Sequence, residues 1–193
     1  MLLSPHEIAE LGFARVGVDV RITRYALFFN PAGIVLGDRV RIDAFAIVAA
    51  GEQGITVGNN VHIASAALLN GSGGRIVMED FSAAAPKVCI WTASDDYSGG
   101  TLTNPTVPDA FKNQRKGPVR LGRHVIIGTS SVILPGVCLN DGAAVGALSL
   151  VSRDVEAGLV VSGVPAKKIA VRPLDRLEKL AQEYLATLPA RPC

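Results

Sequence analysis

Aromatic residues are scarce in this sequence, at 5% of the chain, although hydrophobic residues make up 49%. The apolar side chains are mostly Val, Ile, Leu and Ala, which favours many thin repeated layers over one bulky core. A mean hydropathy of +0.34 excludes a disordered chain. With 193 residues, the sequence is long enough for one domain with a sizeable core.

Strong charge, long apolar runs and paired cysteines are missing as well. The net charge of +2 gives no nucleic-acid footprint, and no apolar run approaches the roughly 20 residues of a membrane span. The N-terminal segment has no basic region of the kind that opens a secretory signal. Cys89, Cys138 and Cys193 show no metal-binding spacing, so we expect free thiols and a cytoplasmic protein.

A period of six residues is the strongest pattern in the chain. From position 121 the sequence reads LGRHVI, IGTSSV, ILPGVC, LNDGAA, VGALSL and VSRDVE. Each block opens with an aliphatic residue, and its fifth position holds Val, Ala or Ser. The pattern also runs upstream, less cleanly, and predicts coils that start at Leu36, Val57, Met78, Leu121 and Leu139.

These starts are 21, 21, 43 and 18 residues apart. Eighteen residues are three blocks of six, and the longer spacings add Gly-rich turns or, after Asp95, an excursion. A six-residue period predicts a short flat strand and a turn, with one inward residue per block. Three such faces make a triangular coil, and stacked coils bury the apolar ladder. A β-sandwich gives no reason for a strict period of six, so we predict an all-β solenoid.

The two ends differ from the coils. Ser4-Pro5-His6-Glu7 has the pattern of a capping box and predicts a helix at residues 5–11. We divide this single structural domain into an N-terminal helix with an irregular first coil, the coils with an inserted loop, and a C-terminal helix with an apolar stripe that packs on the coil end or on a neighbouring subunit. The ranges are 1–33, 34–172 with the loop at 96–117, and 173–193.

The blocks resemble the hexapeptide repeat of the left-handed β-helix acyltransferases over Leu36 to Arg172. The resemblance is strongest to galactoside and maltose O-acetyltransferases and to the acyltransferases of surface polysaccharides such as lipopolysaccharide and O-antigen. It implies a left-handed parallel β-helix, a homotrimer and a groove between subunits. It also implies acetyl-CoA as cosubstrate and a sugar or nucleotide-sugar acceptor.

The stretch GALSLVSRDVEAGLVVSGVPAKKI is similar to the C-terminal signature of that family, beside which the coenzyme A arm lies. The resemblance assigns three residues to the arm or the adenine end and three basic residues to the phosphates. These are Thr129, Ala147 and Ser152, and Arg153, Lys167 and Lys168. Cationic side chains suit the phosphates of coenzyme A. The alternative is a solvated basic edge.

An acidic pair, Asp95 and Asp96, stands where the O-acetyltransferases of the family carry their catalytic histidine. Three interpretations compete. One carboxylate replaces histidine as the base, although an ordinary carboxylate pKa near ~3.9 is low for that role. Alternatively, the acceptor is an amine, which needs less activation, and the pair attracts and deprotonates its ammonium form. In the third, the pair is a polar turn. We prefer the second, an N-acyltransferase of an amino sugar.

The three histidines offer few other candidates. His62 is a second candidate base if a neighbouring subunit brings it into the groove, whereas His124 has the pattern of a solvated corner and His6 belongs to the helix. These positions are too dispersed for the zinc site of a γ-carbonic-anhydrase-like enzyme, so no metal is predicted. Cys89 is interpreted as a bystander thiol. A non-catalytic β-helix scaffold stays open as an alternative function.

Overall fold

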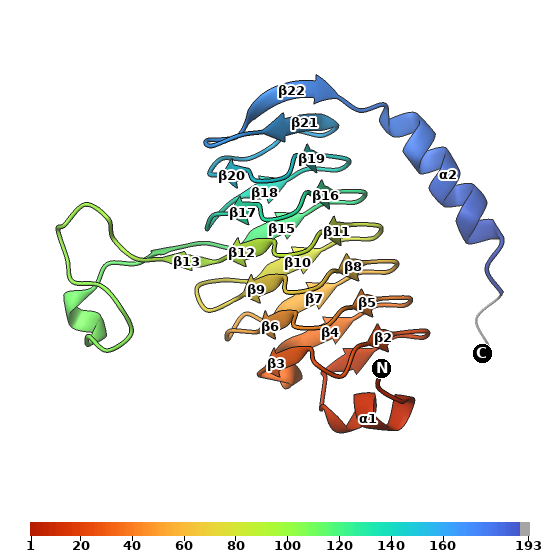
Figure 1. The fold of residues 1–193 in the computed structure, drawn as a ribbon, viewed down its shortest axis with the longest axis horizontal. Helices are drawn as coiled ribbons and strands as arrows, with labels where there is room; N and C mark the ends of the chain where they lie inside the picture. The colour runs from red at the N-terminus through yellow and green to blue at the C-terminus, as the bar shows by residue number, and fades with distance from the viewer. Residues whose placement is uncertain (190–193) are drawn as a thin grey trace.

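The computed structural model describes residues 1–189 and shows short strands stacked into a prism with three faces. A helix lies at each end of the chain, and a long hairpin projects from one side of the prism (Figure 1). Within the described residues, no helix is long and apolar enough to cross a membrane. The parallel β-helix that the six-residue repeat predicts is therefore confirmed.

Every coil contributes one strand to each face. The first face holds β1 (Arg15–Val16), β4 (Ile34–Leu36), β7 (Ile55–Val57), β10 (Ile76–Met78), β15 (Val119–Leu121) and β18 (Cys138–Leu139). The second face holds β2 (Arg21–Ile22), β5 (Arg41–Ile42), β8 (His62–Ile63), β11 (Ala83–Ala84), β16 (Ile126–Ile127), β19 (Ala144–Val145), β21 (Leu159–Ser162) and β22 (Lys167–Val171). The third face holds β3 (Leu27–Phe29), β6 (Ile47–Ala49), β9 (Leu68–Asn70), β12 (Cys89–Trp91), β17 (Val132–Ile133) and β20 (Leu150–Val151).

The coils, numbered from the N-terminus, pair in parallel and in register. On the first face the partners run from strand to strand through the five coil starts that the sequence predicts, Leu36, Val57, Met78, Leu121 and Leu139. All five side chains are buried. Because each inward side chain stacks on the equivalent residue of the next coil, the core is a set of aliphatic ladders rather than a single cluster.

The corners depend on the fourth and second positions of the blocks. His124, Ser130 and Leu148 occupy fourth positions and have left-handed backbones, with φ of 59°, 59° and 57°. At the second position, a Cβ on Gly37 would lie 2.5 Å from the carbonyl oxygen of Gly58 in the next coil. Glycine is therefore required there because adjacent backbones approach too closely for any side chain.

The first coil is regular, and the prediction of an irregular segment over 16–33 was wrong. Val16, Ile22 and Phe28 pair in register with Leu36, Ile42 and Val48 of the second coil. The inward residues are spaced by six, as elsewhere. Arginines and aromatic residues fill the outward positions of this coil, so the block pattern is harder to see in the sequence.

The terminal helices cover different parts of the prism. Helix α1 (Pro5–Glu10) has the predicted capping box, and Ile8 anchors it to the core. Helix α2 (Leu174–Ala186) lies along the corner between the first and second faces and not on the coil end, while its packing on a neighbouring subunit stays a prediction. Glu178 pairs with Arg123 at 3.1 Å, and the Tyr184 hydroxyl donates to Asn60 at 3.1 Å.

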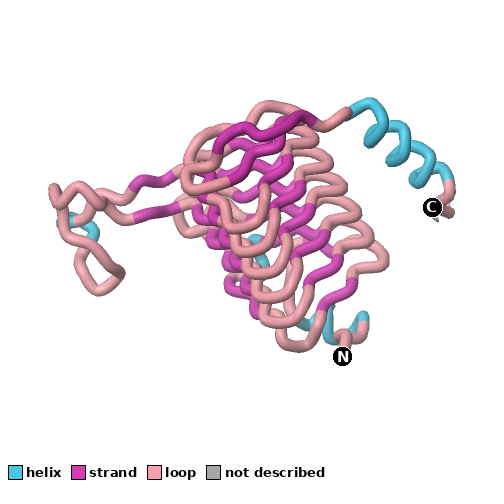
Figure 2. Tube along the Cα trace, turned by 45° about the horizontal axis from the view of Figure 1, so that its top comes forward, coloured by secondary structure: helices cyan, strands magenta, loops and turns pink. Residues whose placement is uncertain are grey.

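The inserted segment leaves the prism between the fourth and fifth coils. Its stem is the antiparallel pair β13 (Ala93–Ser94) and β14 (Arg115–Lys116), with a 3-10 turn, Asp109–Phe111, near its tip. Figure 2 shows it extending away from the prism on the side opposite α2. The excursion predicted after Asp95 is confirmed, although its stem begins earlier. The coils close beneath it, because β10 pairs directly with β15.

We expect Leu69→Ala to lower the free energy of unfolding by about 2–5 kcal/mol, because truncation leaves a cavity in a ladder. Leu69 is fully buried between neighbouring coils. Chemical denaturation measures the change. Leu102→Ala is the matched control, since Leu102 lies in the hairpin and is 59% exposed. Equal effects of the two substitutions would contradict the ladder as the main source of stability.

Candidate active-site groove

A groove of about 560 Å³ lies at the base of the hairpin, against the third face. Trp91 of β12 and Leu134, which follows β17, provide its apolar wall, and Asn70 of β9 adds an amide. Asp95 and Gln114 enter from the two stems of the hairpin. The groove therefore combines this apolar wall with one carboxylate, an arrangement suited to a ligand with a polar reacting group.

Thr92 fixes the point where the hairpin leaves the coil. Its buried hydroxyl donates to the carbonyl of Asn70 at 2.8 Å and accepts the N–H of Gly73 at 2.9 Å. The backbone is thereby tied to the preceding coil just before the chain turns outward. Asp95, three residues later, is therefore attached to a rigid part of the backbone.

The two acidic residues have different surroundings. Asp95 accepts hydrogen bonds from the Gln114 side chain at 2.9 Å and from the backbone N–H of Asn104 at 3.3 Å. It lines the groove, and Asp96 is not among the lining residues. Asp95 is thus held by the far stem of the hairpin while its carboxylate borders the groove.

Asp96 serves the hairpin itself. Hydrogen bonds from Ser98, whose backbone N–H lies at 2.8 Å, and from the Thr101 hydroxyl at 3.0 Å hold the pKa of Asp96 below its usual value. A carboxylate that serves as a general base needs a raised pKa, so the lowered pKa of Asp96 makes it a poorer proton acceptor. Of the predicted acidic pair, Asp95 lines the groove and Asp96 does not.

His62 lies on the second face, away from Asp95 of the same chain. Its Nε2 lies 2.7 Å from Asp43, which also accepts a hydrogen bond from Arg41 at 2.8 Å. Partial burial raises the pKa of Asp43, but the hydrogen bonds from His62 and Arg41 outweigh it and hold the pKa below its usual value. An oriented His–Asp pair is suited to proton transfer, but only a second copy of the chain can bring it to Asp95.

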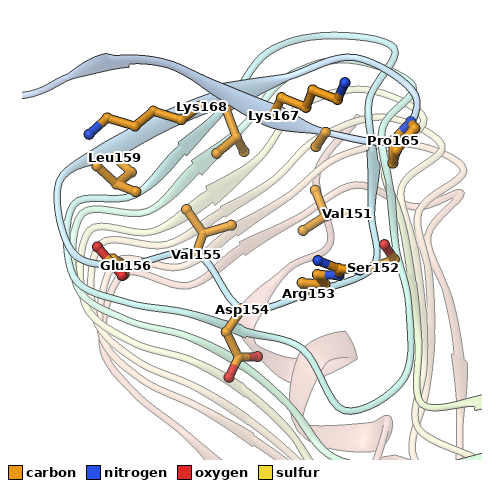
Figure 3. Close-up of a pocket in the computed structure, with 12 residues that line it drawn as sticks. Val151, Ser152, Arg153, Asp154, Val155, Glu156, Leu159, Pro165, Lys167 and Lys168 are labelled. Carbon is orange, nitrogen blue, oxygen red and sulfur yellow. The ribbon is translucent and has the colours of Figure 1, made fainter.

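A second hollow, of about 480 Å³, lies at the C-terminal end of the prism (Figure 3). Ser152, Arg153, Lys167 and Lys168 all line it, as the coenzyme assignment predicts. Figure 3 shows the two ammonium groups pointing in opposite directions, because neighbouring residues of β22 alternate. One chain therefore offers its two lysines to different sides of the hollow.

Thr129 and Ala147 lie apart from this hollow. Both are exposed on the corner between the second and third faces, in adjacent coils, and the backbone N–H of Leu148 donates to the carbonyl of Thr129 at 2.9 Å. The structure thus brings together four of the six residues assigned to the coenzyme. Thr129 and Ala147 can join the other four only along an extended ligand.

His124 is not a solvated corner residue, which corrects the sequence prediction. Its side chain is only 12% exposed, stacks on Phe81 and lies 3.3 Å from Glu178. It holds α2 against the prism through Glu178.

Burial raises the pKa of the Cys89 thiol, which makes it a poorer nucleophile. Cys193 lies outside the described residues. Within residues 1–189, no three His, Cys, Asp or Glu side chains gather in a way that could hold a metal ion.

Sequence reasoning missed three residues of these sites: Trp91, Gln114 and Asp43. Gln114 is 19 residues from Asp95, and only the hairpin pairing brings them together. Asp43 could have been found from the sequence, because aligning the coils places it next to the row that contains Arg41 and His62. Trp91 is the only tryptophan in the sequence and is the last residue of β12, directly before Thr92. Its outward direction follows from the alternation along β12.

Individual proteins of known activity match most of this chain. No family model matches the chain. The dTDP-4-amino-4,6-dideoxy-D-glucose acyltransferase of Escherichia coli is 41% identical over 172 residues, which cover 89% of each chain. The E. coli enzyme and this chain thus correspond over almost their whole lengths.

Solved structures of AntD, an N-acyltransferase from Bacillus cereus, have the same fold. One, a serine-to-alanine variant in complex with dTDP-4-amino-4,6-dideoxyglucose and coenzyme A, gives a TM-score of 0.91 at 38% identity and covers 97% of this chain and 98% of AntD. Another, with dTDP and 3-hydroxybutyryl-CoA, gives 0.91 at 38% identity over 96% of this chain and 97% of AntD.

We expect Asp96→Ala to loosen the hairpin tip, because it removes the acceptor of the Ser98 N–H and the Thr101 hydroxyl. Hydrogen exchange at the Ser98 amide should accelerate about tenfold. The amide of Thr106, held separately by Asn104, is the internal control. Since the pKa of Asp96 is lowered, acid should reproduce the effect only below the usual carboxyl range. Unchanged exchange at Ser98 would contradict this role.

Proposed function

Because the chain belongs to the hexapeptide-repeat acyltransferase family that includes the dTDP-4-amino-4,6-dideoxy-D-glucose acyltransferases, we propose that it acylates the amine of a dTDP-linked amino sugar. It is an acyl-CoA-dependent acyltransferase by that membership. The observation that carries the acceptor class is Asp95, a groove carboxylate at the position where the O-acetyltransferases carry histidine.

The proposed reaction is a direct acyl transfer. The neutral amine attacks the thioester carbonyl, the new C–N bond forms and the C–S bond breaks, and the proton that the nitrogen loses passes by way of Asp95 to the departing sulfur, so that the coenzyme leaves as a thiol. The Asp95 carboxylate attracts the ammonium form, orients it and accepts the proton that the amine loses. Gln114 holds Asp95 in this orientation. Trp91 provides an apolar surface against which the sugar and the acyl chain are placed.

We further propose that the chain acts as a homotrimer in the cytoplasm, with the groove shared between copies. Large apolar side chains are exposed on and around the third face, where a second copy would cover them: Tyr25, Leu27, Phe29, Phe45 and Leu148. Such a copy would also bring its second face, with His62, toward Asp95. The free thiols Cys89 and Cys138 fit a reducing compartment. Surface-polysaccharide synthesis is the process we propose for the product.

The basic end of the prism is proposed to bind the phosphates of the coenzyme. Arg153→Ala combined with Lys168→Ala should weaken acetyl-CoA binding about tenfold or more, because charge-assisted contacts to phosphate are lost. Calorimetry measures this, and quenching of Trp91 fluorescence reports it independently. Lys179→Ala, on an exposed part of α2, is the control. Unchanged affinity would remove these roles, and no binding by the wild-type chain at millimolar acetyl-CoA would favour the scaffold alternative.

Asp95→Asn should lower kcat/KM for the amino sugar by about 10²-fold or more, because the amide attracts no ammonium and accepts no proton. Steady-state acylation of dTDP-4-amino-4,6-dideoxyglucose measures it. Asp96→Asn is the control and should change kcat/KM only a few-fold. Asp95→Asn with unchanged kcat/KM would identify the pair as a structural turn. Faster acylation of the hydroxyl analogue than of the amine would contradict N-acylation.

A further inference from the structure

The N-terminal end of the second face carries a row of basic side chains. Arg21, Arg41 and His62 occupy equivalent outward positions of the first three coils and pair in register. Adjacent members are thus about 4.8 Å apart at the backbone. Arg39 joins them from the neighbouring corner, and the group lines a hollow of about 370 Å³.

The guanidinium groups of Arg21 and Arg41 keep most of their nitrogens free of partners among residues 1–189. Among residues 1–189, the Arg21 side chain has neither a salt bridge nor a hydrogen bond. Arg41 gives only its Nε to Asp43, at 2.8 Å, and its side chain is 62% exposed. Arg39 gives its Nε to Asn60 at 2.9 Å, and its terminal nitrogen lies 3.9 Å from Asp38. The terminal nitrogens of Arg21 and Arg41 are therefore available to a ligand.

Stacked arginines are costly without an anion between them. Like charges on directly paired positions of adjacent strands repel. Asp19 lines the same hollow and offsets one charge, and Asp43 is shared between Arg41 and His62. Asp38 lies 3.9 Å from Arg39 and offsets a third charge. The terminal guanidinium nitrogens of Arg21 and Arg41, which line the hollow, nevertheless have no partner among residues 1–189. Guanidinium groups form two parallel hydrogen bonds to phosphate oxygens, and two such groups one strand spacing apart suit two linked phosphates better than a single carboxylate.

The level of the row along the prism distinguishes it from the coenzyme region. On the second face, six strand steps separate β5 from β22, which carries Lys167 and Lys168. At about 4.8 Å per step this is about 29 Å. Asp95 leaves the fourth coil, between these two levels. Two phosphate-bearing ligands can thus approach the groove from opposite ends of the prism, with their reacting groups meeting near Asp95.

We propose that Arg21 and Arg41, assisted by Arg39, bind the diphosphate of the nucleotide-linked acceptor. This assignment rests on the proposed function. The row and Asp95 lie on different sides of one prism, so each acceptor site takes its arginines from one copy and Asp95 from another. Arg41 has a second function, because its bond to Asp43 also orients His62. Arg21 forms no side-chain hydrogen bond or salt bridge with the described residues, so it is the cleaner residue to test.

The test measures binding of dTDP, inorganic pyrophosphate, thymidine and coenzyme A by calorimetry to the wild-type chain and its variants. Arg21→Ala should weaken dTDP and pyrophosphate about tenfold, and adding Arg41→Ala should weaken them further. Thymidine and coenzyme A should bind as to the wild type. Arg15→Ala is the matched control, an exposed arginine of the same coil on the first face. In turnover, Arg21→Ala should raise the acceptor KM with little change in kcat.

Three results would overturn the assignment. If the wild type binds dTDP and Arg21→Ala together with Arg41→Ala leaves that affinity unchanged, the row is not the diphosphate site, although the proposed function stands. If coenzyme A is weakened as much as dTDP, the row binds the phosphates of the donor instead. If the wild type binds coenzyme A but not dTDP, both the row and the proposed acceptor class fail.

Discussion

Backbone pairing between coils in strict register is the constraint on which the rest of the molecule depends. It places Leu36, Val57, Met78, Leu121 and Leu139 directly over one another and so builds the core. The same pairing acts on the outward side chains. Arg21, Arg41 and His62 form a row for the same reason that the buried apolar residues form a ladder. The buried ladder and the outward row of basic side chains are therefore two sides of the same repeat.

The groove depends on a departure from the repeat. The hairpin that begins at β13 carries Asp95 outward, and Gln114 returns from its other stem to hold the carboxylate. Asp96, next in sequence, is used up in local hydrogen bonds to Ser98 and Thr101. Adjacent acids thus have separate duties, one toward the groove and one toward the hairpin, because their neighbours differ and not because the residues do.

The sequence alone predicts the coils, their starts and the inserted loop, since the six-residue spacing of apolar residues and its interruption can be seen along the chain. It does not predict that His124 is buried, because Phe81 and Glu178 reach it only after the coils and α2 are assembled. The order in the first coil was present in Val16, Ile22 and Phe28, but arginines on its outer side obscured it. Gln114 lies 19 residues from Asp95 along the chain, and Asp43 lies 19 residues from His62; the hairpin and the coil stacking bring each pair into contact.

The direct pairing of β10 with β15 across the hairpin has a consequence for how such a chain can change. Because the coils close beneath the insertion, its length is uncoupled from the packing of the prism. Lengthening a flexible loop costs little, only about 0.6 kcal/mol for each doubling. A chain of this design can therefore be remodelled at one corner, residue by residue, while the ladders inside it stay the same. The stability of the fold and the shape of the groove are therefore determined by separate segments of the chain.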